Sequence, residues 1–250
     1  MTDTVVVVPT YQERDTLPAL LEGLAVHLPY ADVLVVDDAS PDGTARVATA
    51  AGAHVLHRPA KRGLGPAYRA GLGWALAHGY QYIAAMDADG SHDPAALPRM
   101  MRSLADADLV IGSRYVPGGR VEHWPRHRQW LSRGGNRYVR ALTGLPVADA
   151  TAGFRIFRRI VLQTIGVEQL RSNGYAFQVE TALRAYRAGF RIAELDIVFE
   201  ERRAGSSKLS RAVVLEAIWR VPVWAGQRPR HPAAHHPGST GPVELWRGAP

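Results

Sequence analysis

The sequence predicts an α/β fold with a mostly parallel central sheet flanked by helices. Short apolar runs of strand length alternate, over the first 112 residues, with longer segments whose apolar residues recur at helical spacing. Four consecutive valines, Val5 to Val8, show no polar alternation, which is typical of a strand buried on both faces of a parallel sheet. A chain of 250 residues, 46% of them hydrophobic, can bury one sizeable core, so we expect one domain with additions rather than two.

The individual elements follow from local patterns. Strands are expected over residues 4–8, 33–36, 54–57, 82–86, 109–112 and 190–199. Helices are expected from about residue 17 with Asp15 as N-cap, in an Ala-rich stretch after residue 44, in a segment ending near Gly79, and over 94–105 and 174–189. Polar turns at 9–13, 37–44 and 87–93 follow three of the strands. Ligands of such sheets bind beyond the carboxyl ends of the strands, so these turns mark the expected site.

The turn after the fourth strand carries the strongest chemical signal. Asp87 and Asp89 are two residues apart, so their side chains point the same way at the end of an extended segment. Two converging carboxylates favour a cation between them, and their oxygens suit Mg²⁺ or Mn²⁺. The alternative is a solvated acidic turn, but the two neighbouring polar turns favour a metal site that holds the diphosphate of a nucleotide-sugar. A dinucleotide-binding fold is disfavoured, because Pro9-Thr10-Tyr11 stands where its glycine fingerprint belongs.

The composition limits the cellular compartment and the kinds of partner that we expect for the protein. There is no cysteine, which excludes disulfides and thiolate metal sites and suits a reducing compartment. The N-terminus shows no signal-peptide pattern, and no window approaches the ~20 apolar residues of a membrane span. The net charge of +7 fits nucleic acid, anionic lipid or phosphorylated substrates equally well.

The second half of the chain is basic and contains tryptophans. Within a segment at about 120–143, Arg133, Arg137 and Arg140 fall on one helical face, beside apolar residues that include Trp130. This pattern is typical of a membrane-surface helix, while nucleic-acid binding and an ordinary solvated helix remain open. Residues 211–225 form a second amphipathic candidate, and residues 226–250 read as a disordered tail rich in Pro, Gly, His and Arg.

Taken together, the motifs resemble the family 2 glycosyltransferases, and among them the polyprenyl-phosphate (dolichol-phosphate) mannosyltransferases. The matching stretches are Val-Pro-Thr-Tyr-Gln-Glu at 8–13, Asp-Asp-Ala-Ser-Pro-Asp-Gly-Thr at 37–44, Gly-Leu-Gly at 63–65, Asp-Ala-Asp at 87–89, Gly-Ser-Arg-Tyr at 112–115, Thr-Ala-Gly-Phe-Arg at 151–155 and Gly-Ser-Ser-Lys at 205–208. The resemblance spans about residues 4–210 and implies a catalytic domain over residues 1–210. It also implies a GT-A-type nucleotide-sugar-binding fold with peripheral amphipathic helices.

The resemblance implies a role for each matching position. The donor nucleotide would be held by Pro9, Tyr11, Glu13, Val36, Asp38, Asp87, Ala88 and Asp89. The metal, Mg²⁺ or Mn²⁺, would be bound by Asp87, Asp89 and Ser91, although Ser91 replaces a glutamine that some relatives use. Phosphates of the donor or lipid acceptor would be neutralised by Arg114, Arg128, Arg202 and Lys208, and the sugar pocket would be lined by Gln178 and Glu180. Asp89, Arg114 and Arg202 would be the catalytic residues.

The implied reaction moves mannose from GDP-mannose to a polyprenyl monophosphate, with inversion, at the cytoplasmic face of a membrane. The protein would dock peripherally, through its amphipathic segments or a separate membrane-anchoring protein, and would bind no nucleic acid. Asp149 or Glu180 could assist with protons. The alternatives are transfer of glucose or another hexose to the same lipid, transfer of mannose to a soluble acceptor, a non-catalytic nucleotide- or nucleic-acid-binding module, and a degenerate scaffold.

Overall fold

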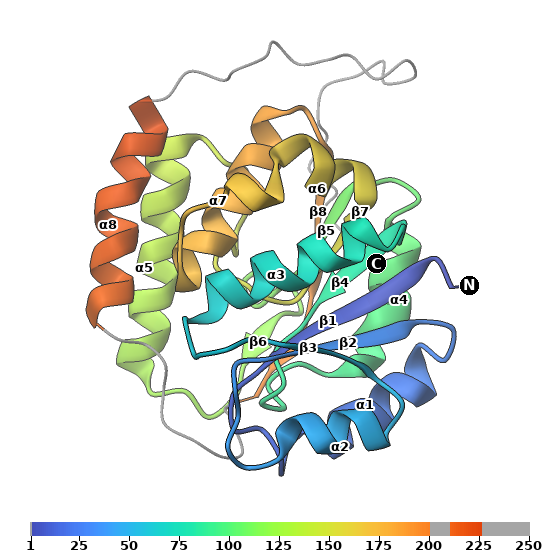
Figure 1. Ribbon diagram of the computed structural model, residues 1–250. Helices are drawn as coiled ribbons and strands as arrows, with labels where there is room; N and C mark the ends of the chain where they lie inside the picture. Colours follow the sequence, from blue (N-terminus) through green and yellow to red (C-terminus); the bar gives the residue numbers. More distant parts are fainter. Residues whose placement is uncertain (1, 201–210, 227–250) are drawn as a thin grey trace.

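The computed structural model describes residues 2–200 and 211–226, with side chains for all of these except 211–218. Seven strands form one sheet in the order β3-β2-β1-β4-β7-β5-β8, in which only β7 runs antiparallel to its neighbours (Figure 1). These strands are β1 (Thr4–Thr10), β2 (Asp32–Asp37), β3 (His54–His57), β4 (Tyr82–Ala85), β5 (Leu109–Ser113), β7 (Arg155–Arg158) and β8 (Ile192–Asp196). The mostly parallel α/β sheet expected from the sequence is confirmed.

Helices cover both faces of this sheet. On one face lie α3 (Leu64–Ala77), α5 (Arg126–Thr143), α6 (Arg159–Ile165), α7 (Gly174–Arg187) and α8 (Arg211–Gly226), and on the other lie α1 (Leu17–His27), α2 (Thr44–Ala50) and α4 (Leu97–Ser103) (Figure 1). Short 3-10 turns, η1 (Pro94–Ala96) and η2 (Val167–Gln169), complete the described helices. Within the described residues, none of the helices is long and apolar enough to cross a membrane.

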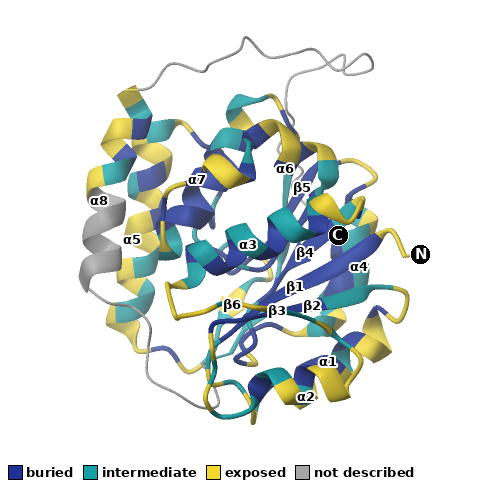
Figure 2. Cartoon of the chain, in the orientation of Figure 1, coloured by how far each residue is buried: buried dark blue, intermediate teal, exposed yellow. Residues whose placement is uncertain are grey.

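The core lies in two layers, one on each side of the sheet (Figure 2). Val5 and Val7 pack into the layer under α3, while Val6 and Val8 pack into the layer over α1. Burial on both faces is therefore the reason for the unbroken valine run. Helix α3 lies very close to β1, because a Cβ added to Gly71 would come within 2.4 Å of Val7 Cγ1. This close approach places Tyr68, one turn earlier in α3, near the carboxyl end of β4.

Three local predictions differ from the structure in type or bounds. The strand predicted at 190–199 is two strands, because β8 ends with its partner β5, and β9 (Val198–Phe199) pairs instead with β6 (Arg120–Val121) in a separate two-stranded sheet. The N-cap of α1 is Thr16 rather than Asp15, since the helix begins one residue later than a cap at Asp15 requires. The helix predicted over 94–105 begins with the 3-10 turn η1, which Asp93 caps by accepting the Ala95 N–H at 2.9 Å.

Strand β7 has no counterpart among the predicted strands. It inserts between β4 and β5, and the turn that precedes it reaches the same edge of the sheet as the ends of those two strands. Helix α8 coincides with the amphipathic segment expected at 211–225, and it packs alongside α5 and α7. The division of the chain at residues 210 and 225 stays a prediction, and the tail predicted at 226–250 lies outside the described residues from 227 onward.

Candidate active site

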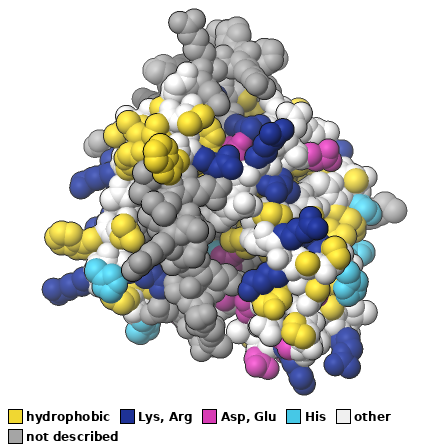
Figure 3. Space-filling model, turned by 60° about the vertical axis from the view of Figure 1, so that its left-hand side comes forward, with side chains coloured by type: hydrophobic (Ala, Val, Ile, Leu, Met, Phe, Trp, Pro, Cys, Tyr) yellow, Lys and Arg dark blue, Asp and Glu magenta, His cyan; other side chains and the backbone are white. Residues whose placement is uncertain are grey.

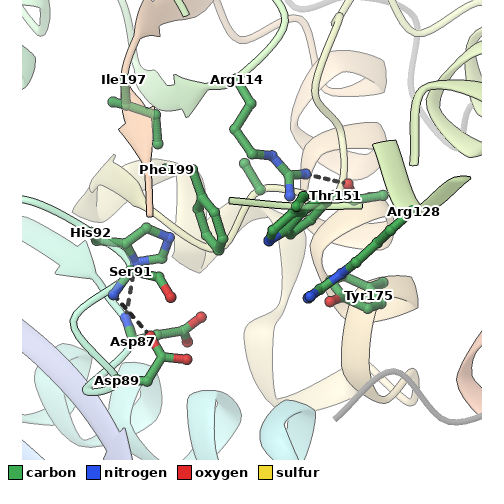
Figure 4. Close-up of a pocket in the computed structure, with 13 residues that line it drawn as sticks. Asp87, Asp89, Ser91, His92, Arg114, Arg128, Thr151, Tyr175, Ile197 and Phe199 are labelled. Atoms are coloured by element: carbon green, nitrogen blue, oxygen red, sulfur yellow. Dashed lines mark hydrogen bonds between the residues drawn. The ribbon is translucent and has the colours of Figure 1, made fainter. Parts of the chain in front are cut away.

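A cavity of about 230 Å³ opens at the edge of the sheet where β4 and β5 end and the turn before β7 arrives (Figure 4). Segments far apart in the sequence form its walls: the acidic turn after β4, the segment from Arg114 to Arg128, the turn at 151–153, the start of α7 and the residues at 197–199. Its lining residues are Asp87, Asp89, Ser91, His92, Arg114, Trp124, Arg128, Thr151, Ala152, Gly153, Tyr175, Ile197 and Phe199. Eight of these had no predicted role, because the predicted roles went mainly to charged positions of the motifs: His92, Trp124, Thr151, Ala152, Gly153, Tyr175, Ile197 and Phe199.

The acidic side of the cavity is built from Asp87 and Asp89, whose carboxylates face the same part of the cavity (Figure 4). Tyr68 Oη donates a hydrogen bond to Asp87 Oδ1 at 2.9 Å, and the Ser91 N–H donates to Asp89 Oδ1 at 3.1 Å. Ser91 Oγ is buried and has no hydrogen-bond partner among the described residues. Across the described residues, no group of three His, Cys, Asp or Glu side chains completes a metal ligand set. The available donors here are therefore two carboxylates and one hydroxyl.

His92 lies directly behind this acidic turn. Its Nδ1 accepts the Asp87 N–H at 3.2 Å, which places the ring proton on Nε2, and its ring stacks on Phe154 at 5.0 Å between centroids. Burial lowers the pKa of His92 and outweighs the nearby carboxylates of Asp87 and Asp89, which act to raise it. A neutral imidazole at pH 7 thus supports the backbone of Asp87. The sequence offered one signal for this role, since His92 belongs to the same polar turn.

Arg114 forms a buried ion pair with Asp149. The Arg114 Nε and Nη2 groups donate to the two carboxylate oxygens of Asp149 at 2.7 Å each, and Nη2 also donates to Thr151 Oγ1 at 2.9 Å. Burial acts to raise the pKa of Asp149, but the charge and hydrogen bonds of Arg114 outweigh it and hold that pKa below its usual range. Burial acts to lower the pKa of Arg114, and Asp149 in turn raises it. Arg114 therefore reaches the cavity as part of a neutral, rigid pair.

Arg128 supplies positive charge on the side of the cavity opposite the acidic turn (Figure 4). Its guanidinium carbon lies 3.9 Å from the centroid of the Trp124 ring, a cation–π geometry. Trp124 is 7% exposed, and its ring packs edge-on against Phe199 at 5.3 Å. The cavity thus has carboxylates at one end and a stacked guanidinium at the other.

Arg155, which is fully buried, fixes the turn at 151–153 that lines the cavity. Its guanidinium donates to the carbonyl oxygens of Ala150 and Ala152 at 2.7 and 2.8 Å and to that of Gln178 at 2.7 Å. Burial lowers the pKa of Arg155 to about 9. Because its hydrogen bonds go to backbone carbonyls on both the turn and α7, Arg155 ties the cavity wall to that helix.

The residues predicted to hold the nucleotide lie in or just after the last residues of β1 and β2 and do not line the cavity; they are Pro9, Tyr11, Glu13, Val36 and Asp38. The structure gives Asp38 a role that the motif did not suggest. Its carboxylate accepts from Arg58 Nη1 at 2.7 Å and from the Arg62 N–H at 3.2 Å, while burial raises its pKa despite these contacts.

The remaining predicted residues do not line the cavity or lie outside the described part of the chain. Gln178 is buried beside Gly153, where a Cβ added to that glycine would lie 3.6 Å from its Nε2. Glu180 accepts from Arg184 Nη2 at 2.6 Å and does not line the cavity. Ala88 is buried within the acidic turn. Arg202 and Lys208 lie outside the described residues, so their roles stay predictions.

Comparison of the sequence with known proteins assigns the chain to a family. Residues 5–166 match the family described as glycosyl transferase family 2. The chain is 48% identical over 223 residues to undecaprenyl-phosphate mannosyltransferase of Micrococcus luteus, a match that covers 87% of this chain and 92% of that protein. It is 45% identical over 228 residues to polyprenol monophosphomannose synthase of Mycolicibacterium smegmatis, a match that covers 88% of this chain and 86% of that protein.

Solved structures agree at the level of the fold. Glucosyl-3-phosphoglycerate synthase from Mycobacterium tuberculosis, in complex with phosphoglyceric acid, superposes with a TM-score of 0.66 at 20% identity, covering 87% of this chain and 79% of that one. The same protein was also solved with Mn²⁺, UDP-glucose and phosphoglyceric acid, and with Mg²⁺ and UDP, at TM-scores of 0.64 and 0.65 over the same shares. The predicted GT-A-type fold is confirmed, and by its sequence match this chain belongs to glycosyl transferase family 2.

Proposed function

We propose that this glycosyltransferase moves mannose from GDP-mannose to a polyprenyl monophosphate. The two mannosyl relatives, 45–48% identical over most of the chain, support the sugar and the lipid phosphate. The single observation that carries the proposal is the cavity itself, with paired carboxylates at one end and a guanidinium at the other. This arrangement suits two anionic reactants that must be brought together against their mutual repulsion.

The acidic end fits a divalent cation of the kind found with UDP-glucose or UDP in the structural neighbours. Asp87, Asp89 and the unpartnered hydroxyl of Ser91 supply only hard oxygen donors, the set that Mg²⁺ and Mn²⁺ prefer. When bound, the cation would offset the negative charge that grows on the departing diphosphate. Tyr68 and His92 would hold Asp87 in place, one through its carboxylate and one through its backbone.

The basic end would orient the acceptor. A phosphate monoester is already an anion at neutral pH, so the nucleophile needs positioning more than it needs a strong general base. Arg128 would bind that phosphate, and Arg114 would contribute hydrogen-bond donors as part of a pair with Asp149 that has no net charge. Asp149 holds Arg114 with both carboxylate oxygens, so it would act as an orienting group rather than as a proton acceptor. A single displacement would invert the anomeric centre and yield a β-linked mannosyl phosphate.

The surface formed by α5 and α8 would bring the enzyme to the lipid. These helices pack side by side, and on them Trp130 is 79% exposed, Trp219 75% and Val223 60%. Helix α5 also carries exposed arginines, which are Arg126, Arg133, Arg137 and Arg140. Figure 3 shows hydrophobic and basic side chains gathered on this side of the molecule. Tryptophan insertion combined with attraction to anionic lipid, about 1 kcal/mol per basic residue near the surface, would support peripheral docking.

The proposal is tested by incubating the full chain with radiolabelled GDP-mannose, polyprenyl phosphate and Mg²⁺ or Mn²⁺. We expect label to enter the organic phase as a mannosyl lipid. UDP-glucose in place of GDP-mannose, and a soluble sugar acceptor in place of the lipid, are the matched controls. If label reaches the lipid only from UDP-glucose, the proposed donor is wrong. If label reaches only the soluble acceptor, the proposed acceptor is wrong. No transfer to any acceptor would contradict the proposal.

A further inference from the structure

A continuous row of aromatic rings joins the acidic turn to Arg128. His92 stacks on Phe154, Phe199 meets His92 edge-on at 5.5 Å between centroids, and Trp124 meets Phe199 edge-on at 5.3 Å. The guanidinium of Arg128 covers the face of Trp124. Because the first ring also accepts the Asp87 N–H, the row runs without a break from one end of the cavity to the other.

The row is anchored where the chain is rigid. Phe154 is fully buried, and the backbone oxygen of that residue accepts the Gly112 N–H from β5 at 2.9 Å. Phe199 is held by the small β6–β9 sheet, which pairs Val121 with it. Trp124 is nearly buried, and its backbone oxygen accepts from Gln129 Nε2 at 3.1 Å. The face that Trp124 offers to Arg128 therefore has a fixed place relative to the sheet.

We infer that Trp124 is a positioning residue that holds the Arg128 guanidinium at a set place across the cavity from Asp87 and Asp89, ready for the phosphate of the acceptor. Arginine is long and has many rotamers, so an unsupported guanidinium loses entropy when it binds phosphate. An aromatic face at 3.9 Å removes part of that loss before the acceptor arrives, and stacking on the flat face of the guanidinium is compatible with hydrogen bonds made by its N–H groups. This inference rests on the proposed function.

The test compares Trp124→Phe with Trp124→Leu. Both replacements leave an apolar side chain, but only phenylalanine keeps a ring face for Arg128. With a short-chain, detergent-soluble prenyl phosphate as acceptor, membrane docking does not enter the measurement. We expect Trp124→Leu to raise the acceptor KM by about threefold to thirtyfold, the range of a cation–π contact, and Trp124→Phe to raise it by less than about threefold. The KM for GDP-mannose should stay within about twofold in both variants.

A double-mutant cycle with Arg128→Ala separates positioning from a purely structural role. In the Arg128→Ala background, Trp124→Leu should leave the acceptor KM unchanged within about twofold, because no guanidinium remains to be held. Trp74→Phe, a tryptophan replacement in α3 outside the cavity lining, is the control for generic loss of an indole. Thermal unfolding midpoints are measured for every variant. If Trp124→Leu does not fold, Phe199→Leu replaces it, with a smaller rise in acceptor KM expected.

Three results would overturn the inference: equal acceptor KM values for the phenylalanine and leucine variants, an equal rise in the KM for GDP-mannose, or a full effect of Trp124→Leu that persists without Arg128. These are distinct from failure of the proposed function. Wild-type protein that transfers no mannose to any prenyl phosphate contradicts the function itself. If the wild type transfers mannose but the Trp124 variants do not raise the acceptor KM selectively over the KM for GDP-mannose, only the role of Trp124 is contradicted.

Discussion

Replacing Asp149 with asparagine should destabilise the fold strongly, because it leaves the buried charge of Arg114 without its partner. The side chain of Asp149 is 0% exposed and that of Arg114 is 5% exposed, so solvent cannot compensate. Breaking a buried ion pair by removing one partner costs about 3–5 kcal/mol of unfolding free energy. For a chain of this size, that loss lowers the thermal unfolding midpoint by roughly 6–20 °C.

The assay is urea and thermal unfolding of wild type, Asp149→Asn and the control Asp15→Asn, which alters an exposed carboxylate and should change stability by less than about 0.5 kcal/mol. The pH dependence gives a second signature. The folded-state pKa of Asp149 is lowered, so its contribution is complete above the unfolded pKa of about 3.9 and is lost as pH falls through the folded value. Asp149→Asn should lack this acid-dependent loss. A destabilisation below about 1 kcal/mol, or an unchanged acid transition, would refute the reasoning.

Three further predictions concern the metal site and the membrane surface. Asp89→Asn should abolish sugar transfer while leaving the unfolding midpoint near that of wild type; retained activity would count against its metal role. Tyr68→Phe removes the hydrogen bond to Asp87 and should raise the Mn²⁺ concentration for half-maximal activity by about 10-fold or more, as measured by metal titration, whereas an unchanged titration would show that this bond is dispensable. The double variant Trp130→Ser and Trp219→Ser should bind anionic vesicles more weakly in sedimentation assays while keeping activity on a soluble short-chain acceptor; undiminished vesicle binding would point to another docking surface or to an anchoring protein.

The parallel part of the sheet could be predicted because strands that are buried on both faces consist of apolar residues. Val5 to Val8 are buried on both faces, so they read as an unbroken apolar run. Strand β7 could not be found in this way, since Arg155 and Arg158 make it look like a polar loop. Arg155 can be buried because backbone carbonyl groups accept its hydrogen bonds in the folded chain. The residues next to Arg155 in the sequence do not indicate these contacts.

The candidate site was predictable to a similar extent. Asp87 and Asp89 lie in one turn, so their spacing alone predicted that they converge. Trp124 and Phe199 are 75 residues apart in the chain, and they meet through a two-stranded sheet too short to leave a sequence signal. The resemblance predicted that Arg114 binds phosphate, which stays a prediction, but not its pairing with Asp149, because the partner comes from a separate turn 35 residues away.

The antiparallel entry of β7 has a consequence for how such enzymes can diversify. The chain leaves the sheet after Ser113 and re-enters it at Arg155 in the adjacent strand, so the whole excursion starts and finishes at neighbouring points that are already hydrogen-bonded to each other. Changes of length in the exposed turns of this excursion therefore leave the register of the sheet intact, provided that buried residues such as Asp149 and Val139 are kept. Since this excursion contains Trp124, Arg128 and α5, such changes would alter the proposed acceptor side of the cavity while Asp87 and Asp89, which lie outside the excursion, keep their positions in the chain.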